Sequence, residues 1–278
     1  MSAEPMRLRE AVTADGISSD RRHLHINALE LWNAAHDRVS AQAVALLEGP
    51  GYAFLTSADG CKLMQVSVAR LRQLAGSWDR LPPDTYLRDG GHYRFRRHSC
   101  FVHEVRSGLL SAVAHRPHWQ STQYNGLHGG MDRLFEPIEA QVIGAEAWTQ
   151  SLTCIGRLFA RVQRVDRWFI EAHQFRIDTA EGIGLPTPEG AHRDGVDFVA
   201  VILIERRGVR GGETRVHGAD GRYASRFKLR ECGSMLLMDD TRVTHETSPI
   251  RPTMAVGIRD TLVLTYRARG FQSPGAAA

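Results

Sequence analysis

The 278-residue chain is poor in cysteine and has no long apolar run. Its four cysteines, Cys61, Cys100, Cys154 and Cys232, are far apart and form no C-x-x-C pair. This spacing argues against a zinc knuckle and a dense disulfide framework, and it favours a reducing, cytoplasmic location. No apolar stretch approaches the ~18 residues that cross a bilayer, and the polar N-terminal segment lacks the apolar centre of a signal peptide. We therefore expect a protein that is neither secreted nor membrane-bound.

An excess of one charge is also missing. The chain has 35 basic and 31 acidic residues, giving a net charge of +4, and the two signs are interspersed. Proteins that bind nucleic acid usually concentrate basic residues on one face. The composition therefore predicts no nucleic-acid partner and leaves the oligomeric state open.

The two ends differ in composition from the rest of the chain. Residues 1–22 are polar, and residues 271–278 consist mainly of small residues with a proline. Such segments bury too little apolar surface to fold, so we expect a flexible tail at each end. The remaining residues 23–270 have a length that one mixed α and β domain commonly uses.

The first part of this domain has helical patterns and one short strand. Residues 27–49 have apolar side chains at three- and four-residue steps and end at Gly49 and Pro50, which predicts a helix. We expect a strand at 52–57, and helices at 67–81 and 139–165. Between the last two helices, residues 84–135 are rich in Gly, His, Arg and aromatic residues and indicate strands and loops.

The last hundred residues consist of short β-type runs separated by turn residues. Six runs alternate or are β-branched: "WFIEAHQFRI", "DFVAVILIE", "GETRVHG", "SMLLMDD", "VTHETSPI" and "DTLVLTYRA". We predict an α+β fold, a double-stranded β-helix (jelly roll) sandwich buttressed by the N-terminal and central helices.

"EGAHRDGVDFVAVILIE" places three polar residues directly before a buried strand. Residues i and i+2 of a strand share a face, so His192 and Asp194 would present an imidazole and a carboxylate together. A third metal ligand is needed. His245 follows the "SMLLMDD" run and precedes Pro249, which makes it a better candidate than His217 in "TRVHGADG".

Two imidazoles and one carboxylate on one face of a metal suit non-haem Fe(II). A catalytic zinc ion would use similar ligands, but the helical H-E-x-x-H spacing is absent. A zinc-dependent hydrolase therefore stays open as an alternative. A second alternative is a non-catalytic ligand-binding jelly roll in which His192 and Asp194 merely cap a loop.

Further positions offer groups that bind carboxylates. Arg259 and Thr261 open the strand "RDTLVLTYR" on one face, and a guanidinium beside a hydroxyl suits a carboxylate. In "HQFRI", Gln174 and Arg176 share a face opposite His173, Phe175 and Ile177. If the polar face lines the sandwich interior, Gln174 and Arg176 become candidate substrate-binding residues.

The arginines of "YRFRRHS" could supply a cation at the edge of the pocket. Arg94, Arg96 and Arg97 alternate with aromatic residues there. The same alternation is typical of an ordinary exposed strand, so both interpretations stay open.

Taken in order, these segments resemble a known family, the 2-oxoglutarate- and Fe(II)-dependent dioxygenases. The resemblance is to the bacterial branch that hydroxylates free amino acids, of which isoleucine dioxygenase is the familiar member. It covers about residues 173–267 and depends on five ordered segments, namely "HQFRI", "PEGAHRDGVDFV", "GGETRV", "MDDTRVTHETSPI" and "RDTLVLTYR".

The resemblance implies a set of roles. His192, Asp194 and His245 fall on the iron ligands, while Arg259 and Thr261 fall on the residues that bind the distal carboxylate of 2-oxoglutarate. It further implies Fe(II), 2-oxoglutarate and O2 as cofactor and co-substrates, with succinate and CO2 as products. The expected substrate is a small molecule, a free L-amino acid.

Overall fold

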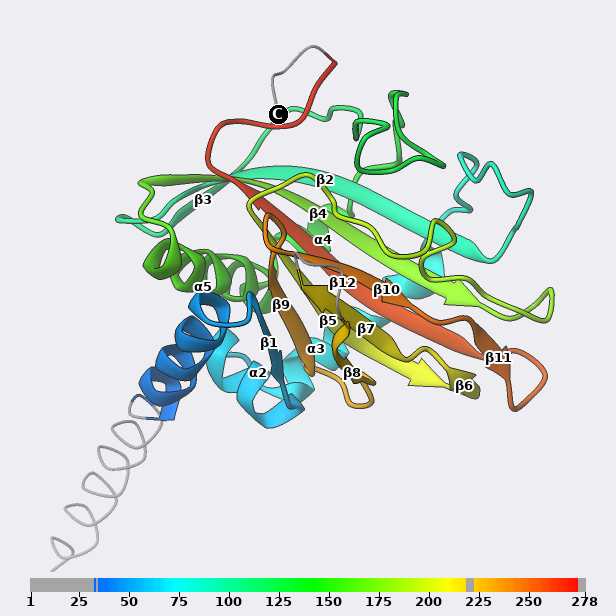
Figure 1. Cartoon of the computed structure of the whole chain (residues 1–278), viewed down its shortest axis with the longest axis horizontal. Coiled ribbons are helices and arrows are strands. Elements are labelled where there is room, and N and C mark those ends of the chain that lie inside the picture. Colours follow the sequence, from blue (N-terminus) through cyan, green and yellow to red (C-terminus); the bar gives the residue numbers. More distant parts are fainter. Residues whose placement is uncertain (1–32, 34, 219–222, 275–278) are drawn as a thin grey trace, which may run out of the picture.

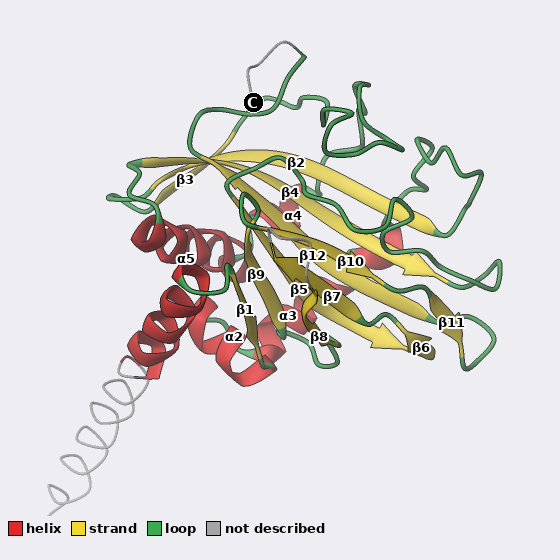
Figure 2. Ribbon diagram, viewed as in Figure 1, coloured by secondary structure: helices red, strands yellow, loops and turns green. Residues whose placement is uncertain are grey.

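A seven-stranded antiparallel sheet forms the centre of the molecule (Figures 1 and 2). The computed structural model describes residues 33, 35–218 and 223–274. The strand order is β1-β9-β5-β12-β4-β2-β3. The strands span Tyr52–Leu55 (β1), Met235–Asp239 (β9), Phe198–Arg207 (β5), Ile258–Arg267 (β12), Arg167–Asp178 (β4), Arg94–Glu104 (β2) and Leu109–Ala112 (β3).

Two smaller sheets pack on one face of the large sheet. One has the order β10-β7-β8 and the other pairs β11 with β6. Their strands span Val209–Gly211 (β6), Thr214–Gly218 (β7), Tyr223–Phe227 (β8), Val243–Thr247 (β10) and Ile250–Pro252 (β11). Val199 of β5 packs against Val216 and Val243 of the smaller sheet. The prediction of an α+β jelly-roll sandwich is therefore confirmed.

Helices cover the opposite face of the large sheet (Figure 2). Alternation along β5 turns Ala200 and Ile202 toward this layer, where they join the main apolar core with Trp148 and Phe159 of α5. The Phe159 ring stacks on Phe198 with 4.5 Å between ring centroids. The helices span residues 35–48, Ser57–Met64 (α2), Val68–Ala75 (α3), Ala140–Ile143 (α4) and Glu146–Val162 (α5), with a 3₁₀ turn at Trp78–Arg80 (η1).

Most predicted elements are present, but the boundaries of two helices and one strand differ. The helix predicted at 139–165 is divided at Gly144 into α4 and α5, and the helix predicted at 67–81 is divided into α3 and η1. The strand predicted at 52–57 ends at Leu55, because the Thr56 side chain accepts a hydrogen bond from Asp59 N and begins α2. Helix α2 is not predicted from the sequence, because its short, Gly-containing segment has a weak apolar period.

The predicted tails lie at the edges of the described region. The tail at residues 1–22 lies outside the described residues, as do residues 275–278 of the other tail. Gln272 belongs to the predicted tail at residues 271–278. It is buried, and its Nε2 donates to Gly195 O at 2.6 Å, so this residue is held in place. Within the part of the chain that is described, no helix is long and apolar enough to cross a membrane.

Candidate active site

His192, Asp194 and His245 meet at one end of the sandwich. A two-way backbone bridge joins the histidines, since His192 N donates to His245 O at 3.1 Å and His245 N donates to His192 O at 3.0 Å. Their ring centroids lie 4.5 Å apart, and His192 Nε2 is 3.9 Å from Asp194 Oδ1. The candidate donor atoms of the three residues all lie within 4.8 Å of one another. Two imidazoles and one carboxylate at this spacing fit the facial donor set of non-haem Fe(II).

The hydrogen bond of His192 leaves its metal-binding nitrogen available. His192 Nδ1 donates to Gly190 O at 2.9 Å, so Nε2 is the nitrogen that faces the other candidate ligands and would bind a metal when deprotonated. Although burial opposes it, the charges of Asp194 and Glu189 raise the pKa of His192. Burial, together with the charge of His192, lowers the pKa of His245 far below its usual value, which keeps that imidazole neutral. Burial also raises the pKa of Asp194. A divalent cation placed among the three residues would offset the cost of burying this carboxylate.

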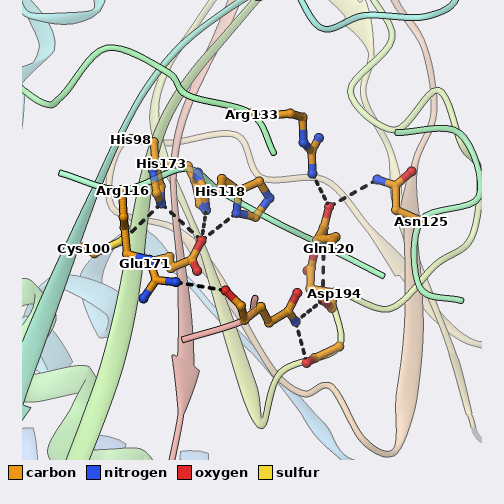
Figure 3. A network of polar contacts seen from close by, with 12 residues as sticks. His98, Cys100, Arg116, His118, Gln120, Asn125, Arg133, Glu171, His173 and Asp194 are labelled. Atoms are coloured by element: carbon orange, nitrogen blue, oxygen red, sulfur yellow. Dashed lines mark hydrogen bonds and ion pairs between the residues drawn. The ribbon is translucent and has the colours of Figure 1, made fainter. Parts of the chain in front are cut away.

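Three neighbouring side chains position Asp194 and the turn that carries it, and Figure 3 shows one of them, Gln120, beside Asp194. Gln120 Nε2 donates to Asp194 Oδ1 at 3.1 Å, and Gln272 Nε2 donates to Asp194 O at 2.9 Å. The Asp240 carboxylate accepts the backbone N–H groups of Asp194, Gly195 and Val196 at 3.0, 2.7 and 3.1 Å. Burial and the neighbouring Asp194 charge raise the pKa of Asp240 to about 7. These bonds fix the direction of the Asp194 carboxylate toward the histidines.

The residue after Asp194 must be glycine. Gly195 has a φ of +76°, and a Cβ at this position would lie 2.4 Å from the Tyr124 ring. Both the backbone conformation and the close ring exclude an ordinary side chain. The glycine therefore allows the tight turn that joins Asp194 to strand β5.

Arg259 and Thr261 line the same cavity as the three candidate ligands. Both point from β12 onto the face that carries Ile177 and Phe175, their partners on β4. Arg259 is 4% exposed, and its Nε has no hydrogen-bond partner among the described residues. A buried guanidinium with a free donor beside a hydroxyl is suited to a carboxylate ligand.

Gln174 and Arg176 lie on the other face of β4, away from the cavity. Gln174 Nε2 donates to Ser77 Oγ at 2.8 Å, and Arg176 pairs with Asp260 at 2.7 Å and Asp79 at 2.8 Å. The predicted alternation is present, but the face that lines the cavity carries His173, Phe175 and Ile177. The expectation that Gln174 and Arg176 contact substrate therefore needs correction, because both side chains point away from the cavity, toward Ser77 and Asp79.

A second group of candidate metal ligands lies beside the cavity, which His118 and His173 of this group line (Figure 3). The Glu171 carboxylate faces His118 Nδ1 at 2.6 Å, His98 Nε2 at 3.1 Å and His173 Nε2 at 3.8 Å. Arg96 Nη2 donates to His173 Nδ1 at 2.7 Å, which leaves the ring proton on Nε2, facing the carboxylate. Burial lowers the pKa of His118 to about 3, so its ring is neutral. These nitrogens serve as donors to Glu171, and the first group is the better metal site.

The cavity also contains polar residues that the sequence pattern did not predict, or for which it allowed two interpretations. Arg94 and Arg96 of β2 line the cavity, as do Gln120, Arg133 and Glu189, whereas Arg97 does not. His217 lies on β7 beside Glu246, with 3.5 Å between His217 Nε2 and Glu246 Oε1. The sequence could have indicated Glu189, because it lies three residues before His192. Gln120 and Arg133 belong to irregular segments, in which no periodic pattern predicts where a side chain points.

Comparisons with known proteins agree with this geometry. The family model described as 2OG-Fe dioxygenase matches residues 75–265. A bsmA homolog from Methylobium petroleophilum, known as a crystal structure, is 50% identical, with 85% of this chain and 96% of that chain covered and a TM-score of 0.81. A search of curated proteins found no significant match.

Two more distant structures share the fold. IDO from Bacillus thuringiensis is 18% identical with a TM-score of 0.69, and the match covers 83% of this chain and 99% of that one. The Fe(II)/α-ketoglutarate-dependent dioxygenase TqaL is 18% identical with a TM-score of 0.68, and the match covers 89% and 92%. The present chain belongs to the 2OG-Fe(II) dioxygenase family. Members of this family use Fe(II) and 2-oxoglutarate, and the bound iron supplies the oxidation chemistry.

Proposed function

We propose that this dioxygenase hydroxylates a free L-amino acid while 2-oxoglutarate is decarboxylated to succinate and CO2. The observation that carries the proposal is the convergence of His192, Asp194 and His245 in a cavity that also contains Arg259 and Thr261. In this proposal the first three residues hold Fe(II). Arg259 and Thr261 bind the distal carboxylate of 2-oxoglutarate.

The chain's own residues orient the reactants and exclude water. Gln120 and Gln272 hold the turn of Asp194, and the backbone bridge sets His192 beside His245. The buried cavity wall keeps bulk water from the reacting atoms. The retained carboxylate of Asp194 favours hydroxylation over halogenation, since related halogenating enzymes have a small residue there. We further propose that residues 23–270 form one domain.

The test is incubation of the purified protein with Fe(II), ascorbate, 2-oxoglutarate and each common amino acid in air. We expect succinate, and a gain of one oxygen atom in one amino acid by mass spectrometry. His192→Ala, Asp194→Ala and His245→Ala should each abolish succinate formation while the thermal unfolding transition persists. His217→Ala should stay active. Turnover retained in the first three variants would refute the ligand assignment, and absence of succinate in the wild type would favour a hydrolase.

A further inference from the structure

The cavity extends beyond the candidate iron site to a group of three buried arginines, Arg94, Arg96 and Arg133, called here the arginine cluster. All three line the cavity and are at most 6% exposed. Within the described part of the chain, Arg94 Nη2, Arg96 Nε and Arg133 Nε have no hydrogen-bond partner. A buried donor without a partner costs about 1–3 kcal/mol. A ligand with several acceptor atoms would satisfy these donors.

The carboxylates of the protein pair directly with only part of the arginine cluster. Arg94 Nε pairs with Asp84 Oδ2 at 2.7 Å, and Arg96 Nη1 lies 3.8 Å from the same oxygen. Glu189, and Glu171 among its three histidines, act on Arg133 from farther away. Burial and the charge of Arg94 lower the pKa of Arg133 to about 10. In the described part of the chain no ion pair joins Arg133 to a carboxylate, so a ligand carboxylate would give this guanidinium a direct partner.

The guanidiniums are fixed before any ligand arrives. Arg96 lies between the rings of Phe135 and Phe175, with its Cζ 3.8 and 4.3 Å from the ring centroids. Arg133 Nη2 donates to Gln120 Oε1 at 2.8 Å. Because these side chains are already ordered, binding an anion here costs little conformational entropy.

The same cavity contains an acidic side chain beside the candidate iron site. Glu189 lines it, and Glu189 Oε1 is 3.4 Å from His192 Nε2. Its Oε2 is buried and has no hydrogen-bond partner among the residues that the structure describes. The cavity therefore has guanidinium donors without partners at the arginine cluster and a carboxylate oxygen without a partner near the candidate iron site.

We infer that the arginine cluster binds the α-carboxylate of the substrate and that Glu189 binds its α-ammonium group. This assignment rests on the proposed function and names the residues that recognise the amino acid. A simple carboxylic acid would leave Glu189 unpaired, and a simple amine would leave the arginine cluster unpaired. A zwitterion satisfies both regions of charge.

The substrate carboxylate and 2-oxoglutarate occupy separate positions in this arrangement. Ile177 of β4 pairs with Arg259 of β12 on one side and with Arg94 of β2 on the other. Two strand spacings separate the backbones of the two arginines by roughly 10 Å. The sheet face therefore offers two carboxylate sites, one on each side of β4.

The experiment is calorimetric titration of the Fe(II)- and 2-oxoglutarate-loaded protein without oxygen, using the twenty common L-amino acids as probes. Each amino acid that binds is then compared with its amide, which lacks the carboxylate charge, and with its N-acetyl derivative, which lacks the ammonium charge. We expect each derivative to bind at least tenfold more weakly than the free amino acid. In Arg133→Gln the ratio of amino-acid affinity to amide affinity should fall to near one. In Glu189→Gln the ratio of amino-acid affinity to N-acetyl-derivative affinity should fall to near one.

Arg97→Gln is the matched control, because Arg97 is on the same strand as Arg96 but outside the cavity. It should preserve both ratios, and all variants should keep the wild-type affinity for 2-oxoglutarate. Equal binding of amino acid and amide by the wild type, unchanged ratios in the variants, or no binding by any probe would overturn the inference. Loss of iron affinity in Glu189→Gln would make Glu189 a metal ligand and overturn its assignment to the ammonium. The proposed dioxygenase function has its own test: it would be refuted if the wild type formed no succinate in air, whatever the binding experiment shows.

Discussion

The Gln120 amide connects Asp194 to Arg133. Gln120 Nε2 donates to Asp194 Oδ1 at 3.1 Å, while Gln120 Oε1 accepts from Arg133 Nη2 at 2.8 Å. Because a guanidinium only donates, the bond with Arg133 fixes which end of the amide faces Asp194. One side chain thus links a candidate iron ligand to the arginine cluster.

Replacing Gln120 should weaken metal binding without unfolding the protein. In Gln120→Ala, Asp194 loses a donor that sets its orientation, and comparable supporting contacts change metal affinity by about 10–100-fold. We expect a loss of about tenfold in Fe(II) affinity, measured by anaerobic metal titration. Gln123→Ala changes an exposed glutamine of the same segment and should leave the affinity unchanged. Equal affinities in the two variants would show that Gln120 has no positioning role.

Arg259→Lys should impair 2-oxoglutarate use selectively. Lysine keeps the charge but loses the planar pair of donors that grips a carboxylate. We expect the KM for 2-oxoglutarate to rise at least tenfold with a smaller change in kcat, measured from succinate formation across 2-oxoglutarate concentrations. The control Arg207→Lys alters a side chain that is 60% exposed on β5. If Arg259→Lys behaves like this control, the assignment of Arg259 is wrong.

Trp78 stabilises the strand that carries Thr261. Its Nε1 donates to Phe175 O at 3.1 Å and lies 3.3 Å from Thr261 O, next to the register shift between Asp260 and Thr261. Trp78→Phe leaves these carbonyls without their donor, so we expect a loss of about 1–3 kcal/mol in the free energy of unfolding.

Trp148→Phe provides the comparison for Trp78→Phe in the same denaturation experiment. Trp148 is equally buried, but its Nε1 has no partner among the described residues. Its replacement removes an unsatisfied donor and should cost less than the replacement of Trp78. The reverse order would contradict a stabilising role for the Trp78 hydrogen bonds.

His103 should make the protein less stable in mild acid. Burial and the nearby Arg157 lower its pKa from 6.5 to about 4, although Glu104 opposes the shift. Between these two values the unfolded chain binds the proton and the folded protein does not, so stability falls as the pH drops from 6.5 toward 4. Once the pH is below both values, the loss in the free energy of unfolding caused by this residue is on the order of 3 kcal/mol.

The measurement is urea denaturation of wild type and His103→Phe at a series of pH values. The variant cannot bind a proton there, so its stability should fall less steeply below pH 6.5. His92→Phe, at an exposed position, should keep the wild-type slope. Parallel curves for wild type and His103→Phe would exclude His103 as a source of the acid sensitivity.

The predictable part of the fold follows from local periodicity. The strands β4, β5, β9 and β12 and the sandwich itself were expected from alternating or β-branched runs, since period two is a property of neighbouring residues. Helix breaks were missed where the apolar pattern continues across them, as at Gly144, because a tertiary contact rather than the pattern decides whether two helical segments stay collinear.

The sequence by itself determined the donor types of the candidate site, their order, and which residues of a strand share a face, because alternation is local. Only the tertiary structure decided which face lines the cavity. Alternation is the same for both faces of β4, and the turn after α3, which carries Ser77 and Asp79, covers the side with Gln174 and Arg176. The arginine cluster and Gln120 likewise come together only through strand pairing and loop packing, which depend on contacts between residues far apart in the chain.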